Sequence, residues 1–523
     1  MASKGKKSTD PDLISELKEI RKQSQLGGGS ERIQAQHDKG KMTARERVLA
    51  LLDKDSFQEI DQYMTHRHTD FGMDKKKTPG DSVVVGFGKI AGRMVAVFSQ
   101  DFTVMGGSFS EVQGQKVAKI LDLAMDSGVP VIGLMDSVGA RIQEGVFSLA
   151  AYSELFWRNT QASGVIPQIS VMLGPCAGGS VYSPGLTDFV IMTRGSSHMF
   201  ITGPKVIKAV TKEEVDFESL GGASVHSSKS GVAHFAADSE KDSLELTRKL
   251  LSYLPSNNAE PPPFEKSGDD PHRQDKKIDS LVPTDSEEAY DMSRVIESII
   301  DKGSFLPVHK DFAPNALVGF ARLHGQAVGI VANQPNALAG VLDIDSSDKI
   351  SRFIRFCDAF NFPLVTFVDT PGFLPGVNQE HGGIIRHGAK IVYAYSEATV
   401  PKIAVIVRKA YGGAYIVLSS KYIRTDLVYA WPTAEIAVMG ADGAVDILYS
   451  KQLKEAEDIE SARTEFINKY QEQFSKPYRA AASGHVDEII IPSETRPRLI
   501  AALELLKNKQ GESRPKKHGN MPA

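Results

Sequence analysis

VGFGKIAGRMV at residues 85–95 and VGFARLHGQAV at residues 318–328 are two versions of one segment, and this repetition decides the fold. The two copies are 233 residues apart, and the same spacing recurs at several landmarks downstream. These landmark pairs are Gly107 and Gly340, Lys116 and Lys349, Pro130 and Pro363, Asp136 and Asp369, and Gly139 and Gly372. Solenoid repeats have periods of roughly 20–50 residues. The much longer period here predicts two related domains.

Helices and strands alternate in both copies, which predicts an α/β fold. Apolar and β-branched residues with glycine turns indicate hairpins, a helix follows each hairpin, and each helix leads into a strand that is apolar on both faces. The expected hairpins are 83–98 and 317–331, the helices 43–57, 111–127 and 346–361, and the strands 129–136 and 362–369. Such strands belong to sheets that helices cover on both sides.

The duplication extends upstream, because LLDKDSF at 51–57 resembles IIDKGSF at 299–305. Between the copies, a proline run at 261–263 and several charges interrupt all periodicity, which is typical of a linker. The expected organisation is an N-terminal tail and helix at 1–30, a first domain at 31–258, a linker at 259–289 and a second domain at 290–523.

The composition of the 523-residue chain excludes several classes of function. It has 41% hydrophobic and 24% charged residues, as an average globular protein does. Its net charge of −4 gives no reason to expect a nucleic-acid partner. Two cysteines are too few for a four-cysteine zinc site and indicate a reducing compartment. No apolar run approaches about 18 residues, and the N-terminus lacks a secretory signal. We therefore expect a soluble, cytoplasmic protein without a bound metal.

Each copy ends a strand in a glycine pair, at Gly178–Gly179 and Gly412–Gly413. The segment that follows the second pair has the character of a helix, so the glycines occupy a strand-to-helix turn. Backbone N–H groups at the start of a helix can hold a developing negative oxygen, and glycine allows a ligand to approach closely. The alternative is that the glycines only permit tight packing of strand against helix. Because two pairs lie in equivalent places, the oxyanion-binding interpretation is favoured.

Side chains that could act as acids, bases or nucleophiles lack the partners that such chemistry needs. Cys176 has no recognisable base and orienting group, and His226 and His234 lack the spacing of metal ligands. Asp136 and Asp369 end strands in Asp-x-x-Gly turns, which are more often structural than catalytic. The sequence therefore predicts that backbone donors carry the chemistry.

Several long motifs, in the same order, closely resemble the β subunits of biotin-dependent acyl-CoA carboxylases, with the propionyl-CoA carboxylase type nearest. The motifs are DSVGARIQEGV (136–146), GPCAGGSVYSPGLTDF (174–189), FVDTPGFLPGVNQEHGG (367–383) and ATVPKIAVIVRKAYGGAY (398–415). The resemblance runs from about residue 12 to the end of the chain. It implies two tandem crotonase-like domains of the ClpP/crotonase type, each a ββα superhelix, that arose by internal duplication.

The resemblance also implies roles for individual residues. The amides of Gly178 and Gly179 are expected to hold the enolate oxygen of the thioester. Those of Gly413 and Ala414 are expected to hold the ureido oxygen of biotin. The residues expected to contact acyl-CoA are Ser137, Val138, Gly139, Ala140, Arg141, Ile142, Tyr415 and Ile416. Those expected to contact biotin are Phe373, Leu374, Gly412, Gly413 and Ala414.

The implied reaction moves CO2 from carboxybiotin to the α-carbon of a short acyl-CoA, giving methylmalonyl-CoA from propionyl-CoA and malonyl-CoA from acetyl-CoA. The base arrives on the cofactor, which explains why the sequence shows no general base. The chain has neither a Met-Lys-Met biotinylation motif nor an ATP-binding glycine-rich loop. The resemblance therefore implies a partner with the biotin carboxylase and biotin carrier functions, and a homohexamer (a trimer of dimers) within a larger complex.

Ile416 departs from the propionyl-preferring pattern, which has Asp at this position. Within the family, isoleucine here resembles the members that accept acetyl-CoA. The position is expected to lie beside both the acyl group and biotin. We therefore expect the chain to use acetyl-CoA as well as propionyl-CoA.

Alternative functions stay open on the sequence. The carboxyltransferase subunit of a methylmalonyl-CoA or glutaconyl-CoA decarboxylase has the same fold and runs the same half-reaction backwards, so only its partner discriminates it. A non-catalytic assembly scaffold is an alternative of another class, against which the intact glycine pairs of both halves argue. A simple crotonase-like hydratase would not need the second pair.

Overall fold

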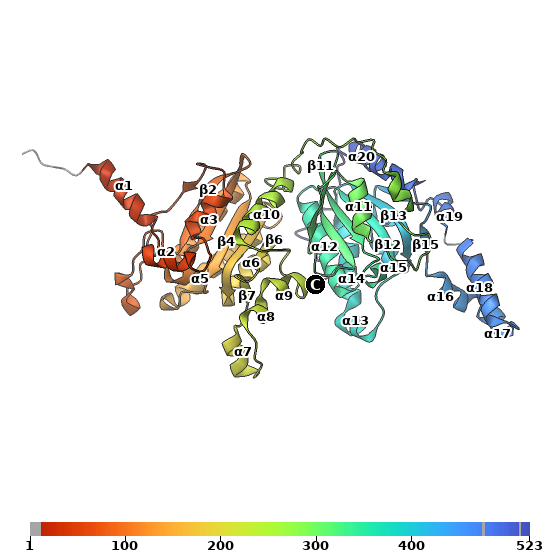
Figure 1. Cartoon of the computed structure of the whole chain (residues 1–523), viewed down its shortest axis with the longest axis horizontal. Helices are drawn as coiled ribbons and strands as arrows, with labels where there is room; N and C mark the ends of the chain where they lie inside the picture. The colour runs from red at the N-terminus through yellow and green to blue at the C-terminus, as the bar shows by residue number, and fades with distance from the viewer. Residues whose placement is uncertain (1–11, 473–475, 512–513, 523) are drawn as a thin grey trace, which may run out of the picture. The chain divides into compact units, whose positions relative to one another are not determined.

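The computed structural model describes residues 12–472, 476–511 and 514–522. The chain divides into two compact units, Met1–Ser252 and Tyr253–Ala523. In Figure 1 the first unit runs from red to yellow-green and the second from green to blue. Each unit contains one eight-stranded sheet.

The sheet of the first unit combines an antiparallel edge with a parallel set. The strand order is β1-β2-β3-β4-β5-β6-β8, and β7 pairs with the end of β5. β1, β2 and β3 are antiparallel, and the later neighbours are parallel. The strands are β1 (Gln58–Glu59), β2 (Val83–Ile90), β3 (Arg93–Gln100), β4 (Val131–Ser137), β5 (Gln168–Ala177), β6 (Phe189–Thr193), β7 (His198–Phe200) and β8 (Phe235–Ala237).

The sheet of the second unit repeats this plan strand for strand. The order is β9-β10-β11-β12-β13-β14-β16, and β15 pairs with the end of β13. The strands are β9 (Leu306–Val308), β10 (Ala316–Leu323), β11 (Gln326–Asn333), β12 (Leu364–Thr370), β13 (Lys402–Tyr411), β14 (Leu427–Ala430), β15 (Glu435–Ala437) and β16 (Glu488–Ile489). The expected hairpins and buried strands of both copies are therefore confirmed.

In the first unit, α1 and α7 extend away from the sheet (Figure 1). The α-helices are α1 (Leu13–Ser24), α2 (Ser30–His37), α3 (Ala44–Leu51), α4 (Glu111–Ser127), α5 (Val146–Ala162), α6 (Tyr182–Leu186), α7 (Pro204–Val210), α8 (Phe217–Gly221), α9 (Ala223–Ser228) and α10 (Glu240–Tyr253). The 3-10 helices are η1 (Asp70–Lys75), η2 (Met105–Gly107), η3 (Ile142–Glu144) and η4 (Gly178–Val181).

In the second unit, α16, α17 and α18 likewise extend away from the sheet (Figure 1). The α-helices are α11 (Met292–Ile299), α12 (Ile344–Ala359), α13 (Val377–Gly382), α14 (Ile384–Glu397), α15 (Gly412–Val417), α16 (Ala441–Leu448), α17 (Ser450–Glu455), α18 (Ile459–Tyr470), α19 (Pro477–Ala482) and α20 (Thr495–Leu505). The 3-10 helices are η5 (Lys276–Ser280), η6 (Leu338–Gly340), η7 (Lys421–Ile423) and η9 (Pro492–Glu494).

The duplication reaches the level of single hydrogen bonds. Asp53 accepts bonds from the two amides of the β2–β3 turn, and Asp301 does the same at the β10–β11 turn. Arg248 donates to Asp53, and Arg496 donates to Asp301. Both pairs of equivalent residues are 248 positions apart. The repetition therefore includes the last helix of each unit, which sequence inspection missed.

One expected helix is shorter than predicted. The sequence suggested a helix over 43–57, but α3 ends at Leu51 and the chain becomes extended at Leu52. The helix ends here because Asp53 is held outside it: its carboxylate accepts hydrogen bonds from the two amides of the β2–β3 turn. At its start, Thr43 forms the capping box with Glu46.

A buried lysine closes the loop before the hairpin in each unit. Lys116 donates to the carbonyls of Gly80 and Val83. Lys349 donates to three carbonyls of the loop before β10 and to that of Ala316, the first residue of β10 and the counterpart of Val83. Burial lowers the pKa of Lys116 to about 8 and that of Lys349 to about 7.

Each sheet has its own hydrophobic core. In the first unit, residues such as Val85, Leu121 and Met172 are fully or almost fully buried. In the second, the segment expected to be a linker adds Ile278 and Val282 to the core around β12 and β13. Part of the proline-rich segment therefore packs as structure of the second unit.

Candidate functional site

In each unit, the Asp-x-x-Gly loop and the glycine turn follow two neighbouring central strands and lie side by side at the carboxyl ends of those strands. The register between β4 and β5 shifts between Met135 and Ser137, and β12 and β13 show the same shift between Val368 and Thr370. Such irregularities re-aim a strand end. In the first unit, an ideal Cβ on Gly139 would lie 3.1 Å from the carbonyl oxygen of Ala177, the last residue of β5.

The first glycine turn offers uncapped backbone donors beside open space. Gly178 has φ of +65°, a left-handed value that favours glycine, and it begins the 3-10 helix η4. The first N–H groups of a helix have no intrahelical partner. Among the described residues, no side chain caps this turn. A Cβ on Gly178 would meet no atom within 4 Å, and one on Gly179 would only touch the ring of Tyr152 at 4.0 Å.

The second glycine turn has the same construction. Gly412 has φ of +54° and begins α15, which no side chain of the described chain caps. A Cβ on Gly413 would meet no atom within 4 Å, whereas Ala414 is buried. Gly178 and Gly412 are equivalent, so the donor pair expected in the second copy, Gly413 and Ala414, begins one position later than the pair expected in the first.

The loop after β4 presents apolar side chains to the outside. Val138 is 53% exposed and Ile142 is 88% exposed. Ser137 is buried, and its hydroxyl accepts a hydrogen bond of 3.1 Å from the amide of Gly139. Ala140 forms a bridge with Phe109. Of this predicted set, Val138 and Ile142 can therefore offer side-chain contacts, while Ser137 and Ala140 shape the loop.

Arg141, which was expected to contact acyl-CoA, has its side chain inside the protein. It is 1% exposed, and its guanidinium binds Asp81 and Glu144. These two carboxylates were not predicted from the sequence. The sequence did contain one sign of this difference: the second copy has Leu374 at the position of Arg141. A leucine cannot form the ion pairs of Arg141, so the two loops are held in different ways.

In the second unit, the predicted biotin contacts belong to the loop after β12 and to the start of α15. Phe373 forms a bridge with Leu342, and the amide of Leu374 donates to the carbonyl of Leu342. Ile416 is 52% exposed. The hydroxyl of Tyr415 is buried and finds no hydrogen-bond partner among the described residues, and burial raises the pKa of Tyr415.

The candidate acids and nucleophiles have structural environments, as the sequence indicated. Cys176 is fully buried, and burial raises the pKa of its thiol to about 12. Asp136 binds Lys41 and Arg47 at 2.7 and 2.8 Å. Asp369 accepts a hydrogen bond of 2.7 Å from the hydroxyl of Tyr290, and burial raises the pKa of Asp369.

The two candidate histidines also have structural partners. His226 contacts the hydroxyl of Ser230 and the carbonyl of Met199. His234 accepts from the amide of Val190. Over the parts of the chain that the structure describes, no group of three or more His, Cys, Asp or Glu could hold a metal ion. In the same residues, no helix combines the length and apolar character needed to cross a membrane.

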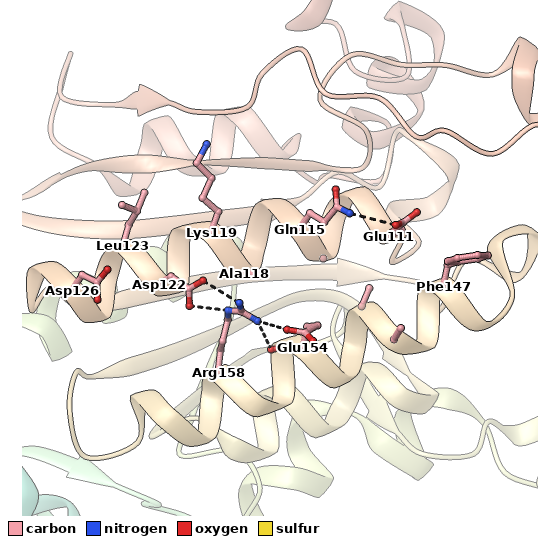
Figure 2. A pocket seen from close by; sticks show the side chains of 13 residues that line it. Glu111, Gln115, Ala118, Lys119, Asp122, Leu123, Asp126, Phe147, Glu154 and Arg158 are labelled. Atoms are coloured by element: carbon pink, nitrogen blue, oxygen red, sulfur yellow. Dashed lines mark hydrogen bonds and ion pairs between the residues drawn. The ribbon is translucent and has the colours of Figure 1, made fainter.

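A groove of about 550 Å³ lies between α4 and α5. Figure 2 shows Arg158 of α5 reaching Asp122 of α4 across it, with Phe147 at the end where α5 begins. Small residues, Gly114, Ala118 and Ala151, are among its lining. None of the predicted site residues lines this groove, which is therefore separate from the two glycine turns.

Comparisons with known proteins identify the family. The carboxyl transferase domain family matches residues 35–521. The chain belongs to this family. The two sheets of equal topology are its two crotonase-like domains, so the expected fold is confirmed. The class of reaction is confirmed as well, because the members of this family are enzyme components that catalyse carboxyl transfer.

Several similar proteins match the carboxyl transferase over almost its whole length. The carboxyltransferase subunit of propionyl-CoA carboxylase from Haloferax mediterranei is 58% identical, over 98% of this chain and 100% of that protein. The α subunit of methylmalonyl-CoA decarboxylase from Veillonella parvula is 55% identical, over 98% and 100%. A structure of the transcarboxylase 12S hexamer, with methylmalonyl-coenzyme A and methylmalonic acid bound, covers 100% of both chains at 50% identity and a TM-score of 0.96.

Proposed function

We propose that this carboxyl transferase moves CO2 from carboxybiotin on a partner carrier protein to the α-carbon of propionyl-CoA and acetyl-CoA. The observation that carries the proposal is the pair of uncapped glycine turns, one in each unit. Each turn has open space beside it, because a Cβ on Gly178 or Gly413 would meet no atom within 4 Å. The substrate class follows the relatives, since the Haloferax mediterranei subunit is named for propionyl-CoA carboxylase. In the proposed division of labour, the domain at 31–258 binds acyl-CoA and the domain at 290–523 binds biotin.

The first turn stabilises the enolate. When the α-proton of the thioester leaves, negative charge develops on the thioester oxygen. The amides of Gly178 and Gly179 are preorganised to donate to that oxygen, because a helix start holds them without intrahelical partners. Removal of one such donor lowers kcat by about 100- to 1000-fold in other enzymes. Val138 and Ile142 exclude water beside the reacting carbon.

The second turn fits the ureido group of biotin. Gly413 faces open space, and the nearby hydroxyl of Tyr415 is a buried polar group without a described partner. The amides of Gly413 and Ala414 would donate to the ureido oxygen, with Phe373 and Leu374 beside the bicyclic ring. Bound carboxybiotin supplies the CO2 and a nitrogen base, so the chain's residues need only to orient the two substrates. This accounts for a site without a side-chain acid or base.

The assembly and its partner belong to the same proposal. The transcarboxylase 12S relative is described as a hexamer and a multienzyme core, and we propose a homohexamer here, joined to a subunit that carboxylates and carries biotin. Both cysteines, Cys176 and Cys357, are free and buried, which supports a reducing compartment such as the cytoplasm.

The second candidate is the reverse reaction. The 55% identity to the methylmalonyl-CoA decarboxylase subunit of Veillonella parvula favours it, because the same two half-sites serve both directions. Ile416 supports carboxylation, since it matches the pattern of acetyl-CoA-accepting carboxylases. The partner subunit decides between the two directions.

The test is transfer of labelled CO2 from carboxylated biotin carrier protein to acetyl-, propionyl- and butyryl-CoA by the purified chain. Product from acetyl-CoA and propionyl-CoA at similar rates is expected. Product from propionyl-CoA alone would remove the dual specificity and keep the carboxyltransferase. If labelled CO2 reached none of the three thioesters while the chain was folded, the proposed substrates would be wrong.

A further inference from the structure

A buried ion cluster lies beneath the loop that follows β4. We call Asp81, Arg141 and Glu144 the loop anchor; their side chains are between 0% and 1% exposed. Nη2 and Nη1 of Arg141 lie 2.7 and 3.0 Å from the two oxygens of Asp81. Nη1 also donates to Glu144 at 3.1 Å. A bidentate pair of this kind adds geometric specificity to charge attraction.

Two serines take the other donors of the guanidinium. Nε donates to the hydroxyl of Ser108 at 3.1 Å, and Nη2 donates to the hydroxyl of Ser82 at 2.9 Å. A guanidinium has five N–H donors, and these contacts account for all of them. Arg141 can therefore act on a substrate only through the loop that carries it.

The anchor joins the loop to the start of α4. Glu144 accepts a hydrogen bond of 2.7 Å from the amide of Glu111, the first residue of α4. Asp81 accepts one of 2.6 Å from the hydroxyl of Ser110, the N-cap of the same helix. Carboxylates at a helix start are favoured by the helix dipole. The position of the loop is thereby fixed to that of a 17-residue helix.

Among the described residues, the second unit has no counterpart of this anchor. In the second unit Leu374 takes the place of Arg141, and the loop is held by two backbone hydrogen bonds to Leu342. The first loop has the equivalent two bonds to Phe109. Backbone bonds are therefore common to both copies, and the ion cluster is an addition in the copy that is proposed to bind acyl-CoA.

We propose that Asp81, Arg141 and Glu144 are positioning residues for the acyl-CoA substrate. They hold the loop in one conformation, so that the exposed side chains of Val138 and Ile142 keep a fixed position beside the thioester. Buried ion pairs contribute little net stability compared with apolar residues of the same size. The anchor therefore serves conformational specificity at the acyl-CoA side and leaves the biotin side untouched. This inference rests on the proposed function.

The variants Asp81→Asn and Arg141→Lys test the anchor. Asn keeps the shape of Asp81 and removes its charge, and Lys cannot make the bidentate contact. Calorimetry should show a Kd for propionyl-CoA raised about tenfold or more, as expected when a charged hydrogen-bond partner is lost. The KM for carboxylated carrier protein should stay unchanged. Hydrogen exchange of the amides in 139–145 should become faster.

Asp53→Asn is the matched control. Asp53 pairs with Arg248 in the same unit, at the opposite end of the β2–β3 hairpin, and both side chains are about a third exposed. We expect its Kd for propionyl-CoA to equal that of the wild type. An unchanged Kd for propionyl-CoA in Asp81→Asn would overturn the inference. So would a rise in KM for both propionyl-CoA and carboxylated carrier protein in Asp81→Asn, if Asp53→Asn showed the same rise. If Arg141→Lys does not fold, Asp81→Asn decides. A wild-type chain that transfers no CO2 and binds no acyl-CoA would overturn the proposed function itself.

Discussion

A methyl group on Gly413 would meet no neighbouring atom within 4 Å, and the backbone there is not left-handed. Gly413→Ala should therefore leave the free energy of unfolding nearly unchanged. The methyl group would occupy the space through which biotin approaches the amides of the turn. We expect kcat/KM for carboxylated carrier protein to fall about tenfold or more, the effect of one misplaced methyl group in a binding pocket. Denaturant titration and transfer kinetics measure the two effects.

Gly268→Ala is the control for this change, because Gly268 also has open space around it and lies in the proline-rich segment. It should alter neither stability nor transfer. A Gly413→Ala enzyme as active as the control would show that biotin does not approach this turn.

Ile416 tests substrate choice. Its side chain is half exposed on the second-to-last residue of α15, so an aspartate at this position stays in contact with water. Ile416→Asp should fold normally and raise the ratio of kcat/KM for propionyl-CoA to that for acetyl-CoA by about tenfold, since changes in a small pocket are worth about 1–3 kcal/mol. Competition between the two thioesters in one reaction measures the ratio. An unchanged ratio would refute the specificity assigned to this position.

At the scale of elements, Lys349 links burial to pH. Its folded-state pKa is about 7 because of burial, whereas an unfolded lysine keeps its proton up to about pH 10.5. Between these values the unfolded state binds more protons, so the free energy of unfolding rises with pH. Lys349→Met should weaken this rise. It should also lower stability by about 3 kcal/mol at pH 7, because buried carbonyls before β10 lose their donor.

Denaturant titrations of wild type and variant from pH 6 to 9 measure both effects. Lys119→Met is the control, since the Lys119 side chain is 53% exposed and exposed ion pairs are worth about 1 kcal/mol or less. Identical pH slopes for Lys349→Met and the wild type would show that Lys349 does not carry the proton linkage.

The periodic elements could be predicted from the sequence, and the side-chain anchors could not. The strand before Asp136 and the hairpin at 83–98 leave patterns of apolar residues and glycine that two copies confirm independently. Arg141 lies in a motif whose resemblance implied a substrate contact, but its partner Asp81 is 60 residues away and belongs to no motif. Such a pairing depends on the packing of β2, α4 and the loop after β4. The pairing of Arg248 with Asp53 was missed for the same reason.

At the scale of the whole molecule, the duplication gives two half-sites with equivalent turns. Gly179 and Gly413 occupy the same position in the two copies, and a Cβ would have room at both. Gly179→Ala should therefore impair the acyl-CoA side and Gly413→Ala the biotin side, each without unfolding its unit. The family resemblance implies that a complete site uses the acyl-CoA side of one subunit and the biotin side of another.

Co-expression of Gly179→Ala with Gly413→Ala tests that arrangement. With equal amounts and random pairing, about half of the dimers contain one subunit of each kind, and one of the two sites in each such dimer is intact. Transfer activity should therefore recover to about a quarter of the wild-type value. Mixing the two separately purified and assembled variants should give no such recovery unless subunits exchange. If the co-expressed assembly stays as inactive as either variant alone, each site is built within a single subunit.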